Sequence, residues 1–362
     1  MSRVLLACGG TGGHIAPGIA LAQRLTDDGH ACVLVVSRKT VDARMTADYP
    51  QFTFVAGRGR GFGPGWINRL LFLPALVASI GSSLRLLRGF RPDVLVCFGG
   101  FMSVGPALAC WLRGIPVIVH ESNRRPGKAV RLIARFARAL HLPAGVRLEG
   151  IPLKRQHDSG FPVRKEIRPS AKEVARKTLG FPTTGKLLLV AGGSQGSRAL
   201  TKWVETQLAE ISVRGLHVLC LTGPGGRGGE VRAGSSVVRF LPFCNQMGLA
   251  YSAADLAITR AGAGTLAELA ACRTPAILVP FPFAADDHQT ANAQYFVETG
   301  AALLVPEGDL LDATALIYDR LSNNSALAEM RNALALADAD NRWDELFQET
   351  VQLARDPRAP AA

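Results

Sequence analysis

The stretch that decides the fold is KLLLVAGGSQGSRAL, residues 186–200. An apolar run leads into clustered glycines, and a helical pattern follows them. The N-terminal stretch RVLLACGGTGGHIAPGIALAQRL, residues 3–25, has the same order. Each predicts a buried strand, a glycine-rich turn and an amphipathic helix. Glycines let backbone N–H groups approach an anion, and the N-terminus of a helix adds a positive dipole. Both turns are therefore candidate phosphate sites, although close packing alone also selects such turns.

The same strand and helix pattern recurs through both halves of the 362-residue chain. Runs that are apolar throughout indicate parallel sheets covered on both faces. The stretch 149–170 is rich in proline, glycine and charge and is the natural linker. We predict an α/β fold of two Rossmann-like domains facing across a cleft, residues 1–155 and 156–339. A last helix at about 340–356 is expected to pack back near the first domain. Ligands of such sheets bind beyond the C-terminal ends of the strands.

The positive charge of the chain lies in one half. Residues 1–150 carry 19 Lys and Arg against 7 Asp and Glu, whereas the remainder carries 22 of each. This asymmetry predicts an anionic partner for the N-terminal half: an acidic lipid, a phosphorylated ligand or nucleic acid. No recognisable nucleic-acid module is present, so we expect no nucleic-acid partner. The seven scattered cysteines indicate reduced thiols in a cytoplasmic protein, and the opening strand leaves no place for a signal peptide.

The common nucleotide fingerprints are not matched. A G-x-G-x-x-G pattern starting at Gly10 and Gly12 would need a third glycine where Ile15 stands. Ser37 and Arg38 occupy the place of the acidic residue that binds the ribose of a nicotinamide cofactor. No G-x-x-x-x-G-K-[ST] sequence occurs either. We therefore predict neither a dehydrogenase nor a P-loop enzyme, and we expect no cofactor.

The most specific stretch is TRAGAGTLAELAACRTPAILVPFPFAADDHQTANA, residues 259–293. Gly262 and Gly264 open a helix, and Glu268 lies one turn inside it. A carboxylate there could accept both hydroxyls of a ribose, or it could lie on a solvated helix face. The amide of Gln289 could bind sugar hydroxyls as donor and acceptor, or it could simply cap a helix.

Seven sequence blocks carry a resemblance to a known family. They are GGTGGHIAPG, CFGGFMSVGPALA, HESN, GFPVR, GGSQGSRALT, RAGAGTLAELA and HQTANA, in the family's order. The chain resembles the MurG-type glycosyltransferases of peptidoglycan synthesis. The resemblance implies the GT-B architecture, with an N-terminal acceptor and membrane-associating domain and a C-terminal UDP-sugar domain. It also implies inverting transfer of N-acetylglucosamine from UDP-N-acetylglucosamine to undecaprenyl-diphosphate-linked muramoyl-pentapeptide. A GT-B transferase with another UDP-sugar and a glycolipid acceptor is the alternative.

The resemblance also implies site residues. Ser194 would contact the diphosphate, Glu268 the ribose diol and Gln289 the sugar, and the segment near Cys244 would hold the uracil through its backbone. The block GFPVR has Phe161 where the family has Asn, and HESN has Ser122 where it often has Gln. The complete donor-binding set that the resemblance implies is Thr11, Gly12, Gly13, Asn123, Arg164, Ser194, Cys244, Ala263, Gly264, Thr265, Leu266, Ala267, Glu268 and Gln289.

An inverting transfer needs a base for the acceptor hydroxyl and stabilisation of the departing diphosphate. His14, at the tip of the first glycine-rich turn, is the leading candidate base because histidine titrates near neutral pH. Glu121 and His120 of the HESN block compete with it, and His14 could instead only position phosphate. No Asp-x-Asp pair lies near a strand end, so we expect no metal; backbone N–H groups, a helix dipole and Arg164 would neutralise the leaving group.

An apolar segment follows in the basic half. Fifteen uncharged residues separate Arg69 from Arg85, fewer than the roughly 20 that a membrane-spanning helix needs. They form either an interfacial patch in a basic collar or a buried helix of the domain. The resemblance favours a peripheral enzyme on the cytoplasmic face of the inner membrane, with an anionic membrane surface as partner. The flanking residues that would contribute are Trp66, Arg85, Arg88, Arg91, Trp111 and Arg113.

Overall fold

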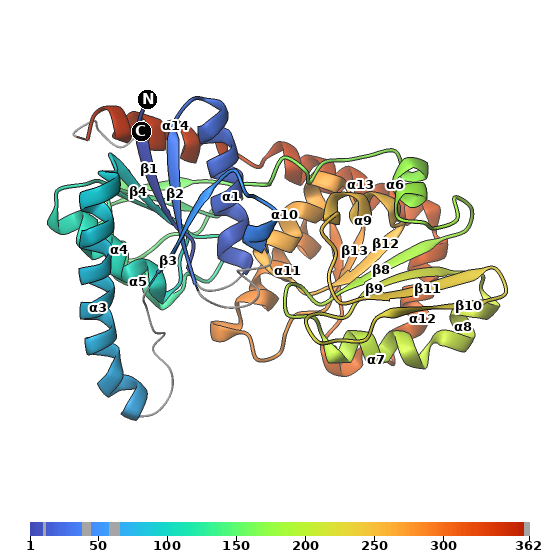
Figure 1. The fold of residues 1–362 in the computed structure, drawn as a ribbon. Helices are drawn as coiled ribbons and strands as arrows, with labels where there is room; N and C mark the ends of the chain where they lie inside the picture. Colours follow the sequence, from blue (N-terminus) through green and yellow to red (C-terminus); the bar gives the residue numbers. More distant parts are fainter. Residues whose placement is uncertain (10–11, 38–44, 58–65, 358–362) are drawn as a thin grey trace. The chain divides into compact units, whose positions relative to one another are not determined.

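The computed structural model describes residues 1–9, 12–37, 45–57 and 66–357, with the backbone alone at residue 12 and residues 66–72. Two compact units make up the chain: Met1–Arg164 with Asn341–Ala362, and Lys165–Asp340 (Figure 1). The boundaries lie at 164/165 and 340/341, whereas the sequence predicted 155/156 and 339/340. The first boundary lies later because β7 (Gln156–Asp158) pairs in parallel with β6 (Ala139–Leu142) and so belongs to the first sheet.

The first unit contains a seven-stranded sheet in the order β3-β2-β1-β4-β5-β6-β7. Every neighbouring pair is parallel. Central runs such as VLVC at Val94–Cys97 are buried at every position, which is typical of a parallel sheet covered on both faces. The remaining strands are β1 (Arg3–Ala7), β2 (Ala31–Val36), β3 (Thr53–Ala56), β4 (Val94–Cys97) and β5 (Val117–His120).

Helices cover both faces of this sheet. On one face α1 (Gly12–Asp27) and α14 (Asp344–Arg355) share a core with β1, β2 and β4. On the other face α3 (Trp66–Phe90), α4 (Val104–Leu112) and α5 (Lys128–Ile133) pack on the same strands. The helical patterns after β1, β3, β4 and β5 therefore predicted helices correctly, and the first Rossmann-like unit is confirmed.

Helix α3 is partly buried in the core of the domain and partly exposed. Ile80, Leu84 and Leu87 pack into the core, while Leu73 and Val77 are 65% and 63% exposed. The side chain of Trp66 lies outside the described residues. Among the described residues, no helix is both long enough and apolar enough to cross a bilayer.

The second unit contains another seven-stranded sheet, in the order β10-β11-β9-β8-β12-β13-β14. Its strands are parallel except for the edge pair β10 and β11, which is antiparallel. A second Rossmann-like unit is thus confirmed, with an antiparallel edge that the sequence did not predict. The strands are β8 (Leu187–Ala191), β9 (His217–Leu221), β10 (Gly229–Ala233), β11 (Ser236–Leu241), β12 (Leu256–Thr259), β13 (Ala276–Leu278) and β14 (Ala302–Leu304).

The helices of the second unit complete its core around the buried Trp203. Helix α7 begins where the Ser197 hydroxyl accepts a hydrogen bond from the Leu200 N–H, an N-cap that ends the glycine-rich turn. The helices are α6 (Lys172–Thr178), α7 (Arg198–Thr206), α8 (Leu208–Val213), α9 (Met247–Ala253), α10 (Ala263–Cys272), α11 (His288–Glu298), α12 (Thr314–Ser322) and α13 (Asn324–Ala339).

Candidate active site

The candidate site has two parts, one at the C-terminal strand edge of each unit. In the first unit His14 follows β1, the Gly99–Gly100 turn follows β4, and Glu121 follows β5. These three strands are neighbours in the sheet, so their carboxyl ends meet at one edge. In the second unit the segments after β8, β12 and β13 are brought together in the same way.

The imidazole of His14 is anchored by one nitrogen. Its Nδ1 lies 2.5 Å from the carbonyl oxygen of Gly9. Because a carbonyl oxygen only accepts, Nδ1 carries the proton, and in the neutral ring Nε2 keeps its lone pair. A Cβ on Gly99 would lie 3.3 Å from this Nε2, so the ring packs over the turn after β4. The arrangement orients Nε2 as a proton acceptor.

The two turns of the first unit pack backbone against backbone. Gly100 has φ 73°, and a Cβ there would lie 2.7 Å from the Gly9 carbonyl oxygen. The buried Ser103 hydroxyl donates to the Gly99 carbonyl at 2.6 Å and holds this turn. Sequence analysis did not single out Ser103, although it lies in the block CFGGFMSVGPALA. Of the predicted residues here, Thr11 lies outside the described residues, while Gly12 and Gly13 begin α1.

Glu121 organises the loop that follows β5. Its Oε1 accepts from the backbone N–H groups of Ser122 and Asn123, both at 2.9 Å, and from the Asn123 amide at 3.0 Å. Its Oε2 accepts from the Gly127 N–H at 2.9 Å. A carboxylate that holds four donors is a loop anchor, and charge-assisted bonds of this kind are strong. The geometry therefore favours His14 over Glu121 as the base.

His120 lies inside the unit. It is 1% exposed, and its Nε2 donates to the Gly160 carbonyl at 2.8 Å. Burial lowers the pKa of His120 to about 4, although the hydrogen bond to Gly160 opposes this shift. A buried neutral imidazole bound to the backbone is suited to structure, so His120 is a poor candidate for the base.

The linker block GFPVR is held by residues distant in sequence. Asn341 binds the backbone N–H and carbonyl of Phe161, and thereby fixes the turn at which the family's own asparagine is missing. Arg164 is the last residue before the first boundary, and its Nη1 donates to the Tyr49 hydroxyl at 3.1 Å. Arg164 as a donor-binding residue stays a prediction.

The glycine-rich turn of the second unit is as tightly packed as the first. A Cβ on Gly192 would lie 2.2 Å from the Ser197 nitrogen. Gly196 has φ 73°, and its Cβ would lie 2.3 Å from the Thr222 carbonyl oxygen of the neighbouring turn. These glycines are therefore required by packing, and Ser194 remains half-exposed within the turn. Packing and phosphate binding do not exclude one another, because both need bare backbone.

Helix α10 begins directly after β12 with Gly262 as its N-cap. Ala263, Gly264 and Thr265 are half-exposed in its first turn, whereas Leu266, Ala267 and Glu268 are buried. The first N–H groups of a helix have no partner within it, so this N-terminus is suited to an anion.

Glu268 does not lie on a solvated face. It is 9% exposed, and its Oε2 accepts from the Tyr251 hydroxyl at 3.1 Å. Tyr251 comes from α9 and was not predicted as a site residue. The only sign of Tyr251 in the sequence is that it is the one aromatic residue of the short helix α9, MGLAYSA.

Gln289 and Cys244 complete the predicted set. Gln289 is the second residue of α11, and its Oε1 accepts from the Phe281 N–H at 2.9 Å. It is half-exposed. Cys244 lies half-exposed between β11 and α9, where burial raises the pKa of its thiol. Within the described ranges, no group of three or more His, Cys, Asp or Glu side chains is arranged to hold a metal ion.

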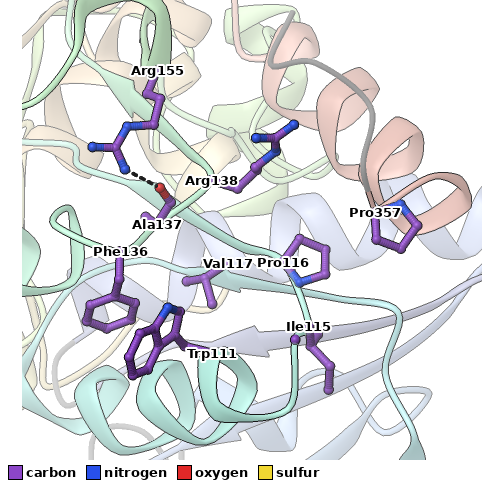
Figure 2. A pocket seen from close by; sticks show the side chains of 10 residues that line it. Trp111, Ile115, Pro116, Val117, Phe136, Ala137, Arg138, Arg155 and Pro357 are labelled. Carbon is purple, nitrogen blue, oxygen red and sulfur yellow. Dashed lines mark hydrogen bonds between the residues drawn. The ribbon is translucent and has the colours of Figure 1, made fainter.

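A groove of about 560 Å³ in the first unit lies apart from these residues. Figure 2 shows Trp111 and Phe136 on one side of it, and Arg155 bound to the Ala137 carbonyl at 2.9 Å. It lies where β5 and β6 begin, the opposite end of these strands from Glu121. None of the predicted site residues lines it.

Comparison with known families covers both units. Residues 4–142 match the glycosyltransferase family 28 N-terminal domain, and residues 187–343 match its C-terminal domain. The chain belongs to glycosyltransferase family 28. It is therefore a hexosyltransferase.

Two curated relatives carry the name UDP-N-acetylglucosamine–N-acetylmuramyl-(pentapeptide) pyrophosphoryl-undecaprenol N-acetylglucosamine transferase. The protein from Opitutus terrae is 42% identical, covering 98% of this chain and 96% of the relative. The protein from Parasynechococcus marenigrum is 36% identical, covering 96% and 99%. The crystal structure of Acinetobacter baumannii MurG has a TM-score of 0.71 at 24% identity, covering 98% and 99%. The MurG-type resemblance and the GT-B fold are confirmed.

Proposed function

We propose that this protein transfers N-acetylglucosamine from UDP-N-acetylglucosamine to the muramoyl hydroxyl of undecaprenyl-diphosphoryl-N-acetylmuramoyl-pentapeptide. The observation that carries the proposal is the 42% identity to a relative of that name over 98% of this chain, which includes both strand edges. The alternative, another UDP-sugar with a glycolipid acceptor, would use the same fold.

The donor is assigned to the second unit. The glycine-rich turn with Ser194 and the first turn of α10 present backbone N–H groups suited to a diphosphate. Glu268, held by Tyr251, would accept the ribose hydroxyls, and Gln289 would bind the sugar. The backbone near Cys244 would hold the uracil. The resemblance also assigns Arg164, Asn123, Thr11, Gly12 and Gly13, which belong to the first unit, to donor binding.

The reaction is a single displacement with inversion. The acceptor hydroxyl oxygen forms the new bond to C1 of the sugar while the bond from C1 to the UDP oxygen breaks. The hydroxyl proton passes to Nε2 of His14, which the Gly9 contact keeps as the acceptor nitrogen. The negative charge that develops on UDP is met by backbone N–H groups of the turn and the α10 N-terminus.

The membrane surface is assigned to helices α3 and α4, which pack on one another. Leu73 and Val77 are exposed on α3, and Trp111 and Leu112 are 53% and 61% exposed on α4. Arg85, Arg88, Arg91 and Arg113, which are exposed on or just after the same two helices, supply positive charge. Apolar side chains beside basic ones favour binding in the interface of an anionic membrane. We therefore propose a peripheral enzyme on the cytoplasmic face of the inner membrane, where its lipid acceptor lies.

The deciding experiment measures transfer of labelled N-acetylglucosamine to a polyprenyl-diphosphate-linked muramoyl peptide in the presence of EDTA. We expect transfer, with a β linkage in the product by NMR. A parallel reaction with a diacylglycerol acceptor tests the alternative. If UDP-N-acetylglucosamine binds and only the glycolipid accepts the sugar, the acceptor assignment is wrong. Loss of transfer in EDTA with recovery on adding Mg²⁺ would contradict the metal-independent mechanism.

A further inference from the structure

Arg260 occupies a central place at the strand edge of the second unit. It follows β12 directly and is 8% exposed. Its Nη1 donates to the carbonyl groups of Val279 at 3.1 Å and Pro280 at 3.2 Å. Its Nη2 donates to the Ser197 hydroxyl at 2.8 Å and also contacts the Glu307 carboxylate. One buried guanidinium is therefore shared by several loops.

These partners come from neighbouring strands. Ser197 ends the turn after β8, Val279 and Pro280 follow β13, and Glu307 opens a short 3-10 helix (Glu307–Asp309) after β14. The sheet order is β8-β12-β13-β14. A single side chain thus joins the segments that leave four adjacent strands, at the edge where ligands of such sheets bind.

The turn 192–197 is held in place by the hydrogen bond from Arg260 to Ser197. Gly193 and Gly196 have φ near 75°. Because glycine has no Cβ, the backbone of this turn can adopt many conformations when it is not held by other contacts. Ser197 stands at its far end, three residues after Ser194. The Ser197 oxygen receives both the Leu200 N–H and the Arg260 guanidinium. Holding Ser197 therefore holds the last residue of the turn relative to the start of α10, three residues beyond Arg260.

Glu307 holds the guanidinium in turn. A buried guanidinium needs an opposite charge and hydrogen-bond acceptors, and Glu307 supplies the carboxylate. Its side chain is 25% exposed, so the carboxylate lies at the border of the core. A planar guanidinium with several fixed donors makes these bonds simultaneously, which a lysine cannot do.

We propose that Glu307 is a positioning residue that acts through Arg260 and Ser197 to fix the glycine-rich turn for the donor diphosphate. The identity of the ligand rests on the proposed function; the linkage itself does not. Glu307 itself does not touch the substrate. Its effect is to keep the N–H groups of the turn and of the α10 N-terminus in one arrangement, so that binding does not have to order them.

The test uses full-length protein and UDP as the probe. The variants are Glu307→Ala, Ser197→Ala and the double variant. The control is Glu230→Ala, which breaks an ion pair with Arg239 on the β10–β11 edge of the same unit. The measurements are the Kd of UDP by calorimetry, and amide hydrogen exchange of peptides covering 192–197.

We expect Glu307→Ala to raise the Kd of UDP on the order of tenfold and to speed exchange of 192–197 by a similar factor. Glu230→Ala should match wild type in both. Ser197→Ala also removes the cap of α7, so the decisive comparison is the double variant. Because both residues act through one guanidinium, the double variant should weaken UDP binding no more than Ser197→Ala does.

Two results would overturn the inference. One is unchanged exchange and unchanged UDP affinity in Glu307→Ala. The other is a double variant whose loss of affinity equals the product of the two single losses. If wild type binds no UDP at all, the proposed function fails, and the exchange measurement still decides the linkage. If wild type binds UDP while Glu307→Ala behaves as wild type, only the linkage fails.

Discussion

Asn341 hydrogen-bonds both backbone groups of Phe161, a residue 180 positions earlier. Its Oδ1 accepts from the Phe161 N–H at 2.7 Å, and its Nδ2 donates to the Phe161 carbonyl at 3.0 Å. The two residues stand beside the two places where the chain passes between units. The amide thus joins the end of the first long segment of the unit to the start of its last one.

Asn341→Ala should destabilise the first unit. Two backbone groups at a residue that is 8% exposed would lose their partners, at about 1–3 kcal/mol each. We expect the free energy of unfolding to fall by about 2–6 kcal/mol in urea titrations. Asn341→Asp keeps the acceptor and loses the donor, so its free energy of unfolding should lie between those of wild type and Asn341→Ala. An unchanged midpoint for Asn341→Ala would contradict the role of this amide.

His14→Asn separates catalysis from positioning. The asparagine amide can donate to the Gly9 carbonyl as Nδ1 does, but it offers nothing in place of Nε2. Because His14→Asn and His14→Ala both remove the general base, each should lower kcat about 10²–10⁴-fold. The Kd of UDP should change less than about twofold. If His14→Asn keeps most of the activity while His14→Ala loses it, then His14 only holds the turn.

Glu121→Gln tests the loop anchor. The new NH₂ group replaces an acceptor oxygen and faces backbone donors, so we expect a loss of stability of about 2 kcal/mol. The accompanying fall in kcat should stay below about tenfold. Glu149→Gln, a change at an exposed carboxylate, is the matched control. A loss of activity of 10³ or more without any change in melting temperature would instead assign Glu121 as the base.

Glu268 should set the preference for ribose. Wild type should bind UDP more tightly than 2′-deoxy-UDP, because the carboxylate would otherwise lack a hydroxyl partner. Glu268→Ala should bind the two nucleotides within about twofold of each other. Tyr251→Phe, which removes the hydroxyl that holds Oε2, should reduce the preference in part. An undiminished preference in Glu268→Ala would remove this residue from the ribose site.

The free energy of unfolding should fall in mild acid. The pKa of His120 is about 4 in the folded chain and about 6.5 when unfolded, so the unfolded chain binds more protons between these values. Stability is therefore lost as pH falls below 6.5, by about 2 kcal/mol at pH 5 from this group. Burial also lowers the pKa of His157 and His217, which act in the same direction.

His120→Gln isolates this share of the pH dependence. The glutamine amide can still donate to the Gly160 carbonyl, but it does not titrate. Unfolding by urea at pH 7 and pH 5 should show a smaller difference for the variant than for wild type. Equal differences would mean that His120 does not contribute.

The parallel strands and the glycine-rich turns could be predicted because local sequence determines them. A strand covered on both faces is apolar throughout, as Leu187–Ala191 is, and a helix start after clustered glycines is recognisable. The edge strand Gly229–Ala233 could not be predicted from the sequence. An exposed strand need not be apolar, and this one includes glutamate and arginine. Its pairing with Ser236–Leu241 depends on backbone contacts.

Residues that act through distant partners were also missed. Phe161 and Asn341 are joined across 180 positions, and that contact helps to place the boundary after Arg164. Arg260 looks like any charged residue after a strand, since its partners at 197, 279 and 307 lie on other loops. Buried polar contacts of this kind follow from the packed tertiary structure and have no local pattern.

The second unit is an insertion within the first, since residues 165–340 begin and end between parts of it. Leu346 and Leu353 of α14 are fully buried in the core that also holds α1 and β1. As the chain leaves the ribosome, the inserted unit is complete while the N-terminal unit still lacks its last helix. The usual order of folding during synthesis is therefore reversed. Because α14 packs on β1, β4 and α1, this face of the first sheet is covered completely only when the last part of the chain arrives, and a premature stop after residue 340 would leave it open.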